Sequence, residues 1–277
     1  MALLEARGIG HAYGSRTILD GIDLAFEKGE VVSLLGPNGC GKTTLIKILL
    51  GIISPRAGQV VFEGTPIARL SPKAYARRVA YVPQVHRTAF PYAVEDVVAM
   101  GRIPHQSAWS LSAERDHECV KDALAKLRIE HLRKRAYTEI SGGERQLTLI
   151  ARALAQGADT FIMDEPTSAL DYGHQVRLLE QLARLADEGL TCISSTHSPE
   201  HALWASDRVV MIQGGHVVAD GTPEEQVVPE NLRLLYGVQV RVAKVGEHAA
   251  CIPCALRARR PAAGARAPIV MPRFRGR

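Results

Sequence analysis

The most restrictive feature of this 277-residue sequence is the eight-residue segment GPNGCGKT at positions 36–43. The segment fits the pattern G-x-x-x-x-G-K-[S/T] and lies between an apolar, strand-like run at 30–35 and a segment at 43–50 that we expect to be a helix closed by Gly51. A glycine-rich turn in this position directs backbone N–H groups and the positive end of a helix dipole at phosphate oxygens. The sequence therefore predicts a phosphate-binding loop in an α/β fold.

Two residues of this loop have chemical roles that a plain glycine turn does not require. Lys42 would reach the β- and γ-phosphates of a nucleotide, and the hydroxyl of Thr43 would ligate Mg²⁺. We expect the whole loop to contact the nucleotide, through Gly36, Pro37, Asn38, Gly39, Cys40, Gly41, Lys42, Thr43 and Thr44.

Two carboxylates follow another apolar run, residues 160–163, and a third such run spans 190–194. Open parallel sheets place their chemistry at the carboxyl ends of strands, so we expect Asp164 and Glu165 to lie beside the phosphates. Asp164 suits a water-mediated contact with Mg²⁺, and Glu165 suits a general base that polarises the attacking water. An Asp-Glu pair alone is more often part of a solvated loop, but together with a phosphate loop it indicates a nucleotide-hydrolysing site.

The segment 88–156 differs from its surroundings, because it contains three helical patterns and no strand pattern. These patterns cover residues 94–100, 112–127 and 141–155. We therefore predict a nucleotide-binding α/β core formed by residues 1–87 and 157–247, interrupted by a helical subdomain at 88–156. The core sheet should be mainly parallel, with an N-terminal antiparallel β portion formed by the short alternating segments of residues 1–85.

The helical segment carries a second candidate anion site at Ser141-Gly-Gly-Glu144. A capping box accounts for Ser141 and Glu144, but it does not account for Gly142 and Gly143, each of which costs a helix up to about 1 kcal/mol relative to Ala. Close backbone approach to another group would compensate, and a helix N-terminus with free amides binds anions. A second anion site in a chain with one phosphate loop suggests a nucleotide held mainly by another subunit.

The positive charge of the chain is concentrated at its end. Residues 248–277 contain seven arginines and no Asp or Glu, so the formal net charge of +5 becomes −2 for residues 1–247. We expect this Ala-, Pro- and Gly-rich segment to be a disordered tail, with binding of anionic lipid or RNA as the alternative, and the core to lack a DNA-binding face. Within the tail, Cys251 and Cys254 form a C-x-x-C without a second pair, which we interpret as incidental.

Two absences bear on location. The sequence contains no run of about 18 uncharged apolar residues, and its N-terminus lacks a basic segment followed by an apolar stretch. We therefore expect residence in the cytoplasm, and any membrane function would need partner subunits.

Six motifs occur in order along the chain. They are the phosphate loop, Gln84 after Tyr81-Val-Pro83, Ser141–Gln146, Ile162–Pro166, Ser168–Asp171 and Ser195-Thr-His197. Together they resemble the ATP-binding cassette (ABC) family of transport ATPases over about residues 1–240. The resemblance implies that Tyr13 stacks on adenine, that Gln84 contacts Mg²⁺ and water and senses a membrane subunit, that His197 holds the γ-phosphate, and that Asp171 lies at a dimer seam.

The resemblance also implies a composite site. ATP would be sandwiched between the phosphate loop of one copy and residues Ser141, Gly142 and Gly143 of a second copy. The implied catalytic residues are Lys42, Gln84, Glu165 and His197, and the implied Mg²⁺ ligands are Thr43, Gln84 and Asp164.

Three positions depart from the commonest family pattern, namely Ile140 for Leu, Glu144 for Gln and Leu147 for Arg. The negative charge of Glu144 would repel an incoming phosphate unless its carboxylate is hydrogen-bonded in a capping box. All six motifs are present, so we expect an active enzyme.

A cassette of this length without membrane spans resembles bacterial importer ATPases, which form a homodimer beneath two permease subunits fed by an extracytoplasmic binding protein. Such a subunit would lie peripherally on the cytoplasmic face of the inner membrane and bind no nucleic acid. Residues 88–102, 223–225 and 229–237 resemble the group that serves iron-siderophores, haem and cobalamin, so we expect a metal chelate as cargo. The alternatives are molybdate or another oxyanion in the same role, and a soluble cassette ATPase of iron-sulfur cluster assembly. Cassettes of translation or DNA repair are disfavoured, because the chain has neither a second cassette nor a long coiled coil.

Overall fold

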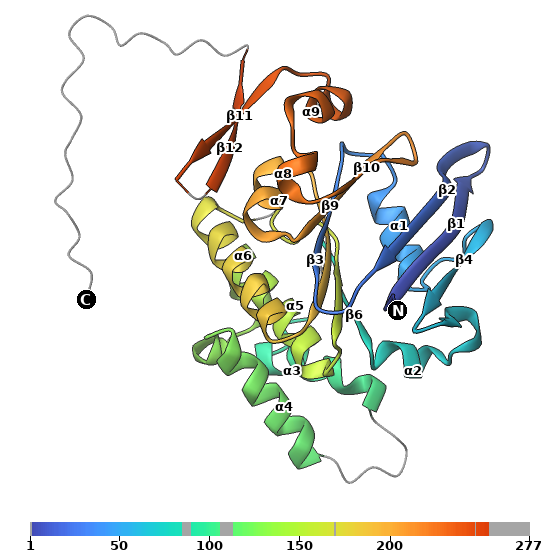
Figure 1. Cartoon of the computed structure of the whole chain (residues 1–277). Coiled ribbons are helices and arrows are strands. Elements are labelled where there is room, and N and C mark those ends of the chain that lie inside the picture. Colours follow the sequence, from blue (N-terminus) through green and yellow to red (C-terminus); the bar gives the residue numbers. More distant parts are fainter. Residues whose placement is uncertain (1, 85–89, 106–112, 169, 247, 255–277) are drawn as a thin grey trace, which may run out of the picture.

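The computed structural model describes residues 2–84, 90–105, 113–168, 170–246 and 248–254. A six-stranded sheet with strand order β10-β9-β3-β8-β7-β6 lies at the centre of the fold (Figure 1). Its strands are β3 (Val31–Leu35), β6 (Val79–Val82), β7 (Thr160–Met163), β8 (Thr191–Thr196), β9 (Arg208–Gln213) and β10 (His216–Gly221). All neighbouring strands are parallel except the β9–β10 hairpin, which confirms the predicted mainly parallel sheet.

The register of this sheet brings the ends of three strands to one edge. Leu35 of β3 lies opposite Thr196 of β8, and Met163 of β7 lies opposite Ser194, which also belongs to β8. Strands β3 and β7 are buried along their whole length, as is typical of parallel strands covered on both faces. The loops that follow β3, β7 and β8 therefore meet at this edge.

A four-stranded antiparallel sheet, of order β2-β1-β4-β5, confirms the predicted N-terminal β portion. Its strands are β1 (Leu4–Tyr13), β2 (Arg16–Phe26), β4 (Ala57–Phe62) and β5 (Thr65–Pro66). The sheet shares a core with helix α1 (Lys42–Leu49), in which Ile22 and Phe26 pack in one cluster with Leu45 and Ile48. Two short helices, η1 (Ile67–Arg69) and α2 (Pro72–Ala76), lead from this sheet to β6.

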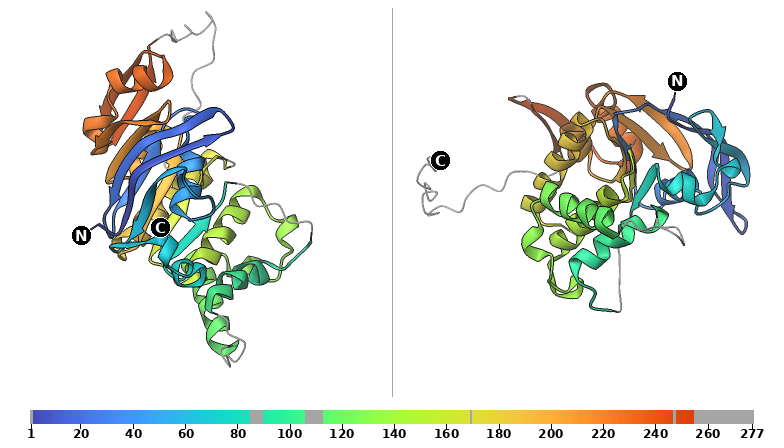
Figure 2. Two further views of the ribbon diagram at one scale, coloured as in Figure 1. Left: turned by 90° about the vertical axis from the view of Figure 1, so that its right-hand side faces the viewer. Right: turned by 90° about the horizontal axis from the view of Figure 1, so that it is seen from below.

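The described residues from 94 to 156 form helices joined by turns and contain no strand. They form α3 (Val94–Ala99), η2 (Met100–His105), α4 (Ala113–Lys126), η3 (Glu130–Leu132), η4 (Tyr137–Glu139) and α5 (Gly142–Gln156). Figure 2 shows these helices, in green, gathered on one side of the molecule. Helix α5 ends where Gly157 adopts a left-handed conformation with φ 72°. The predicted start of the helical subdomain, residue 88, lies outside the described residues.

Helix α6 (Tyr172–Asp187) joins the helical part to the sheet, because its buried Leu178 and Leu182 share a cluster with Leu149 of α5 and Phe161 of β7. After β8 follow α7 (Pro199–Ala205), α8 (Pro223–Gln226) and α9 (Pro229–Tyr236). No helix in the described part of the chain combines the length and the apolar character needed to cross a membrane.

The predicted disordered tail is wrong for its first six residues. Residues 248–253 form strand β12 (His248–Pro253), which pairs antiparallel with β11 (Val240–Val245), and Trp204 Nε1 donates a hydrogen bond to the Ala249 carbonyl at 2.9 Å. Backbone pairing and packing of Val242 and Cys251 against the cluster around α7 and α9 outweigh the composition of this segment. Residues 255–277, the remainder of the predicted tail, lie outside the described residues.

Candidate functional site

The phosphate loop joins the buried end of β3 to helix α1. Lys42 is only 5% exposed, and its ammonium Nζ donates to the backbone carbonyls of Gly36 at 2.6 Å and Pro37 at 3.1 Å. A Cβ atom on Gly36 would lie 2.3 Å from the carbonyl oxygen of Ile212, so β9 packs too closely for any other residue. Gly41 has φ 113° and caps α1, a conformation that side chains disfavour. The two glycines thus fix the course of the loop.

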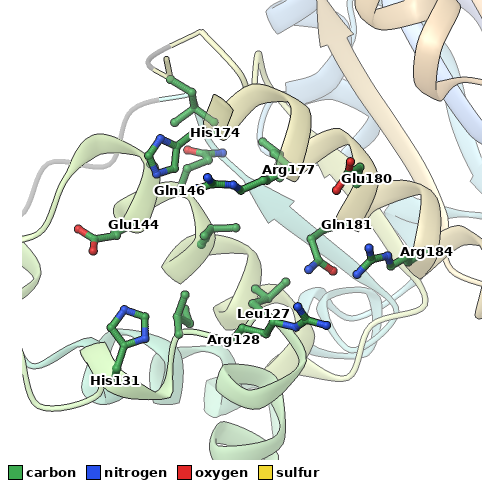
Figure 3. Close-up of a pocket in the computed structure, with 15 residues that line it drawn as sticks. Leu127, Arg128, His131, Glu144, Gln146, His174, Arg177, Glu180, Gln181 and Arg184 are labelled. Atoms are coloured by element: carbon green, nitrogen blue, oxygen red, sulfur yellow. The ribbon is translucent and has the colours of Figure 1, made fainter. Parts of the chain in front are cut away.

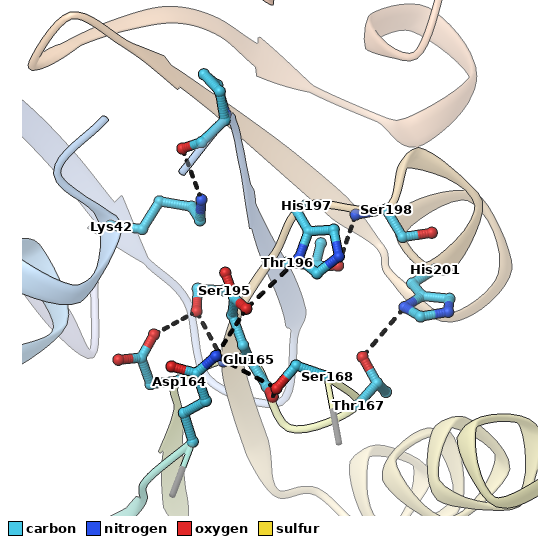
Figure 4. A network of polar contacts seen from close by, with 12 residues as sticks. Lys42, Asp164, Glu165, Thr167, Ser168, Ser195, Thr196, His197, Ser198 and His201 are labelled. Carbon is cyan, nitrogen blue, oxygen red and sulfur yellow. Dashed lines mark hydrogen bonds and ion pairs between the residues drawn. The ribbon is translucent and has the colours of Figure 1, made fainter. Parts of the chain in front are cut away.

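Asp164 is the hydrogen-bonding centre of the site. Its Oδ1 atom accepts a hydrogen bond from Thr43 Oγ1 at 3.1 Å and another from Ser195 Oγ at 2.7 Å. Asp164 is 3% exposed and directly follows β7, whereas Thr43 belongs to α1 and Ser195 to β8. Figure 4 shows Asp164 beside Ser195. The structure therefore brings Asp164 to the phosphate loop, as the sequence predicted.

Ser195 also accepts a hydrogen bond from the Glu165 backbone N–H at 2.9 Å. Sequence reasoning placed Ser195 in a motif without giving it a role, since only the pairing of β7 with β8 brings its hydroxyl to both acidic residues. Ser195 thereby holds the two carboxylate-bearing residues in a fixed relation.

Two of the four implied catalytic residues, Gln84 and His197, lie beside the carboxylate of a third, Glu165. Glu165 Oε2 accepts a hydrogen bond from Gln84 Nε2 at 3.0 Å and lies 3.4 Å from His197 Nδ1 (Figure 4). The backbone of Glu165 is left-handed, with φ 44°, which is uncommon for a residue with a side chain and is typical of functional sites. The fourth, Lys42, lies in the phosphate loop itself.

A hollow of about 430 Å³ lies over the loop. It is lined by Arg16, Ile18, Asn38, Gly39, Gly41, Lys42, Thr43, Thr44, Gln84 and Glu165. Tyr13 pairs in the β1–β2 ladder with Arg16, one of the residues that line the hollow. Tyr13 is 53% exposed, and its ring lies edge-on to His11, with ring centroids 4.9 Å apart. The cationic side chains of Arg16 and Lys42, the backbone of a glycine-rich loop and an exposed aromatic ring close to one hollow suit a nucleotide.

The oxygen atoms beside the loop fit a magnesium ion. Thr43 offers a hydroxyl and Asp164 a carboxylate, and Gln84, which donates through Nε2, keeps its amide oxygen available. Magnesium is commonly bound by few protein oxygens together with substrate phosphates rather than by a complete protein cage. The described residues hold no group of three or more His, Cys, Asp or Glu that could bind a metal by themselves.

The Ser141–Glu144 segment forms the expected capping box at the start of α5. Ser141 Oγ accepts from the Glu144 N–H at 3.2 Å, and the Glu144 carboxylate accepts from the Ser141 N–H at 2.7 Å. These hydrogen bonds from Ser141 lower the pKa of Glu144 below the ordinary glutamate value. The negatively charged carboxylate of Glu144 is therefore hydrogen-bonded to the N-terminus of its own helix.

The close approach predicted by the two glycines occurs at Gly143, within the chain. A Cβ atom there would lie 2.7 Å from Cδ2 of His174, a residue of α6. Ser141 and Gly142 are exposed, and the described residues that line the hollow over the phosphate loop include none of residues 141–143. One copy of the chain thus does not bring this segment and the phosphate loop together.

Asp171 caps the next helix. Its carboxylate accepts from the His174 N–H at 2.9 Å and also bonds the His174 ring, and these bonds lower the pKa of Asp171. Beside this cap, a second hollow of about 450 Å³ lies between α5 and α6, with Arg128, Arg177 and Arg184 at its walls (Figure 3). Its described lining contains no residue of the phosphate loop, so it is distinct from the hollow described above.

An apolar groove of about 550 Å³ opens on another face, between α2, β6 and η2. Ile52 and Ile103 line it and are 56% and 60% exposed, and Tyr75 and Tyr81 form part of its floor. Tyr81 precedes Gln84 by three residues, so the groove adjoins the segment that reaches Glu165.

Comparison with known proteins agrees with this geometry. The sequence pattern described as ABC transporter matches residues 19–168. The hemin import ATP-binding protein HmuV of Nocardia farcinica is 39% identical over 246 residues, covering 86% of this chain and 84% of that protein. The iron(3+)-hydroxamate import ATP-binding protein FhuC of Bacillus subtilis is 33% identical over 243 residues, covering 87% and 90%. A solved structure described as a metal-chelate type ABC transporter in an inward-facing conformation superposes with a TM-score of 0.80 at 30% identity, covering 91% of this chain and 97% of that chain.

The capping box gives a stability prediction with a defined pH dependence. Glu144→Ala should lower the free energy of unfolding at pH 7 by about 0.5–1 kcal/mol, whereas Glu144→Gln, which keeps the cap, should cost less. Because the folded-state pKa of Glu144 is lowered, its contribution is present above the unfolded-state pKa and is lost as the pH falls through the folded value. Urea unfolding at pH 7 and near pH 4 measures this, and a difference between wild type and Glu144→Ala that does not shrink in acid would contradict it.

Proposed function

The chain belongs to the ABC transporter family, as an ATP-hydrolysing subunit of an importer, and we propose that it drives uptake of a metal chelate of the iron-siderophore, haem or cobalamin type through separate permease subunits. The observation that carries the catalytic part is the convergence of Gln84 and His197 on Glu165 beside the phosphate loop. Two importer relatives that handle iron compounds and a metal-chelate structural neighbour support the choice of cargo. They do not favour an oxyanion or a role in iron-sulfur assembly.

ATP binding follows from the loop and its rim. The loop amides and the ammonium of Lys42 neutralise the phosphates, and Tyr13 offers its exposed ring to the adenine. Thr43, Asp164 and the amide oxygen of Gln84 would hold Mg²⁺, which when bound offsets the charge of the β- and γ-phosphates.

Hydrolysis follows from the surroundings of Glu165. Its carboxylate accepts the proton of the attacking water, while Gln84 and Ser195 fix its side chain and its backbone. His197, next to the same carboxylate, would contact the γ-phosphate. Because these groups are already in position, no free energy is needed to order them when the transition state forms.

A second copy of the chain would complete the site. Ser141 and Gly142 are exposed at a helix N-terminus and are separate from the phosphate loop of their own chain, so a partner's nucleotide can receive their amides. Glu144 does not oppose this approach with a free charge, because its carboxylate is bound to the Ser141 N–H. Asp171 would then lie at the seam as the cap of α6.

The apolar groove is the proposed docking surface for a permease subunit, which places the chain peripherally on the cytoplasmic face of the membrane. Ile52 and Ile103 expose apolar area that a permease segment would bury, and neighbouring Tyr81 links the groove to Gln84. Docking would therefore act directly on the catalytic residue that contacts Glu165. The extracytoplasmic binding protein would contact the permease, not this chain.

Replacing the proposed base tests the hydrolytic mechanism. Glu165→Gln should retain Mg-ATP binding, because the phosphate loop is unchanged, while kcat falls by about 10²–10⁴-fold because an amide cannot accept the proton. Nucleotide binding by fluorescence and phosphate release are the measurements. Turnover at the wild-type rate would move the base elsewhere, with His197 as the first candidate.

Mixing two inactive variants tests the composite site. Ser141→Arg should spare ATP binding by the monomer and block hydrolysis by preventing closure, whereas Lys42→Ala should abolish ATP binding. In a mixed dimer both lesions fall on one site and leave the other intact, so partial ATPase activity should return on mixing. A Ser141→Arg protein that hydrolyses ATP normally would reduce the segment to a helix cap.

Capture from detergent-solubilised membranes tests the transport role. The tagged wild-type chain should retain permease subunits, whose identity names the cargo class. Ile103→Glu should lose them, because it places a charge in the groove; Ile252→Glu, at an equally exposed apolar position on β12 (50% exposed), is the matched control. Capture of soluble scaffold proteins alone, or equal capture by both variants, would refute the docking proposal.

A further inference from the structure

Helix α9 brings one side chain to the loop that carries His197. The hydroxyl of Tyr236, the last residue of α9, donates a hydrogen bond to the backbone carbonyl of His197 at 3.1 Å. The two residues are 39 positions apart in the chain. Residues 229–237 resemble the importer group that serves iron-siderophores, haem and cobalamin. Neither the sequence nor the motifs of the nucleotide site assign a role to this segment.

Helix α9 is anchored to the sheet that carries the phosphate loop. Leu232 and Leu235 are buried in one cluster with Leu35, the last residue of β3. Gln213 Nε2 of β9 donates to the Leu234 carbonyl at 2.7 Å. Tyr236 is therefore held in a fixed position relative to the start of the phosphate loop.

The His197 side chain, by contrast, has few restraints of its own. It is 53% exposed, and its ring lies 3.4 Å from Glu165 Oε2. The loop after β8 is turned locally by the Ser198 N–H, which donates to Thr196 Oγ1 at 3.1 Å. A hydrogen bond to the His197 backbone thus supplies a restraint that the side chain lacks.

The Tyr236 hydroxyl is suited to act as a permanent donor. Burial raises its pKa above the ordinary tyrosine value, and neighbouring thiol and carboxyl groups act in the same direction. The phenol therefore stays protonated, and able to donate to a carbonyl, to a higher pH than an ordinary tyrosine does.

We infer that Tyr236 is a positioning residue for ATP hydrolysis: its hydroxyl fixes the backbone of His197, so that the imidazole faces Glu165 and the γ-phosphate. This inference rests on the proposed function, because it assigns His197 to the phosphate. It extends the catalytic apparatus to a C-terminal helix that lies outside all the nucleotide-binding motifs.

The test compares steady-state ATPase kinetics of the purified full-length chain and its Tyr236→Phe variant. We expect kcat to fall about three- to tenfold, the range for losing one neutral hydrogen bond, with the KM for ATP unchanged within about twofold. The KM should hold because the hydrogen bonds of Lys42 and Thr43 go to Gly36, Pro37 and Asp164 rather than to Tyr236. Incorporation of p-aminophenylalanine at position 236 restores an N–H donor at the same ring position and should restore kcat.

Gln213→Met is the matched control, because it removes a hydrogen bond that anchors α9 but leaves His197 untouched. An unchanged kcat in Tyr236→Phe, an equal loss in Gln213→Met, or no recovery with p-aminophenylalanine would each overturn the inference. Failure of the proposed function gives a different result, namely a wild-type chain whose ATPase activity does not depend on Glu165.

Discussion

The hydrogen bonds accepted by Asp164 join the parts of the molecule on which the site depends. Thr43 lies in the first turn of α1, Asp164 directly follows β7 and Ser195 belongs to β8, so one buried carboxylate joins three elements that are far apart in the sequence. Burying a carboxylate is costly unless it is hydrogen-bonded, and Thr43 and Ser195 both donate to its Oδ1 atom. The same arrangement holds the phosphate loop at a fixed distance from the acidic residues.

Glu165, the proposed general base, shows how the scaffold supports a strained backbone. Its left-handed backbone is unfavourable by itself and persists because Ser195 accepts its N–H while Gln84 and His197 surround its carboxylate. Restraints on these neighbours then matter for the chemistry. Tyr236 provides one of them from a helix that belongs to the C-terminal packing cluster rather than to the nucleotide site.

At the start of α5, contacts within the chain explain some residues, and the proposed contact with a second copy explains others. Ser141 and Glu144 form a capping box, which satisfies helix amides and binds the charge of Glu144. Gly143 is required by the His174 ring of α6, a contact that no local pattern reveals. Neither the capping box nor the His174 contact accounts for the exposed helix N-terminus with Gly142. In the proposed dimer, this N-terminus is the part that would bind the partner's nucleotide.

The phosphate loop, the mainly parallel sheet, the helical segment and the candidate residues Lys42, Asp164 and Glu165 could be predicted from the sequence, because they depend on local spacing and on the rule that strand ends share one edge. Other features of the site depend on contacts between distant segments. Ser195 and Tyr236 act through register and packing between segments distant in the chain, which a local pattern does not encode. Strand β12 likewise exists because β11 and Trp204 supply partners that its composition, read in isolation, does not disclose.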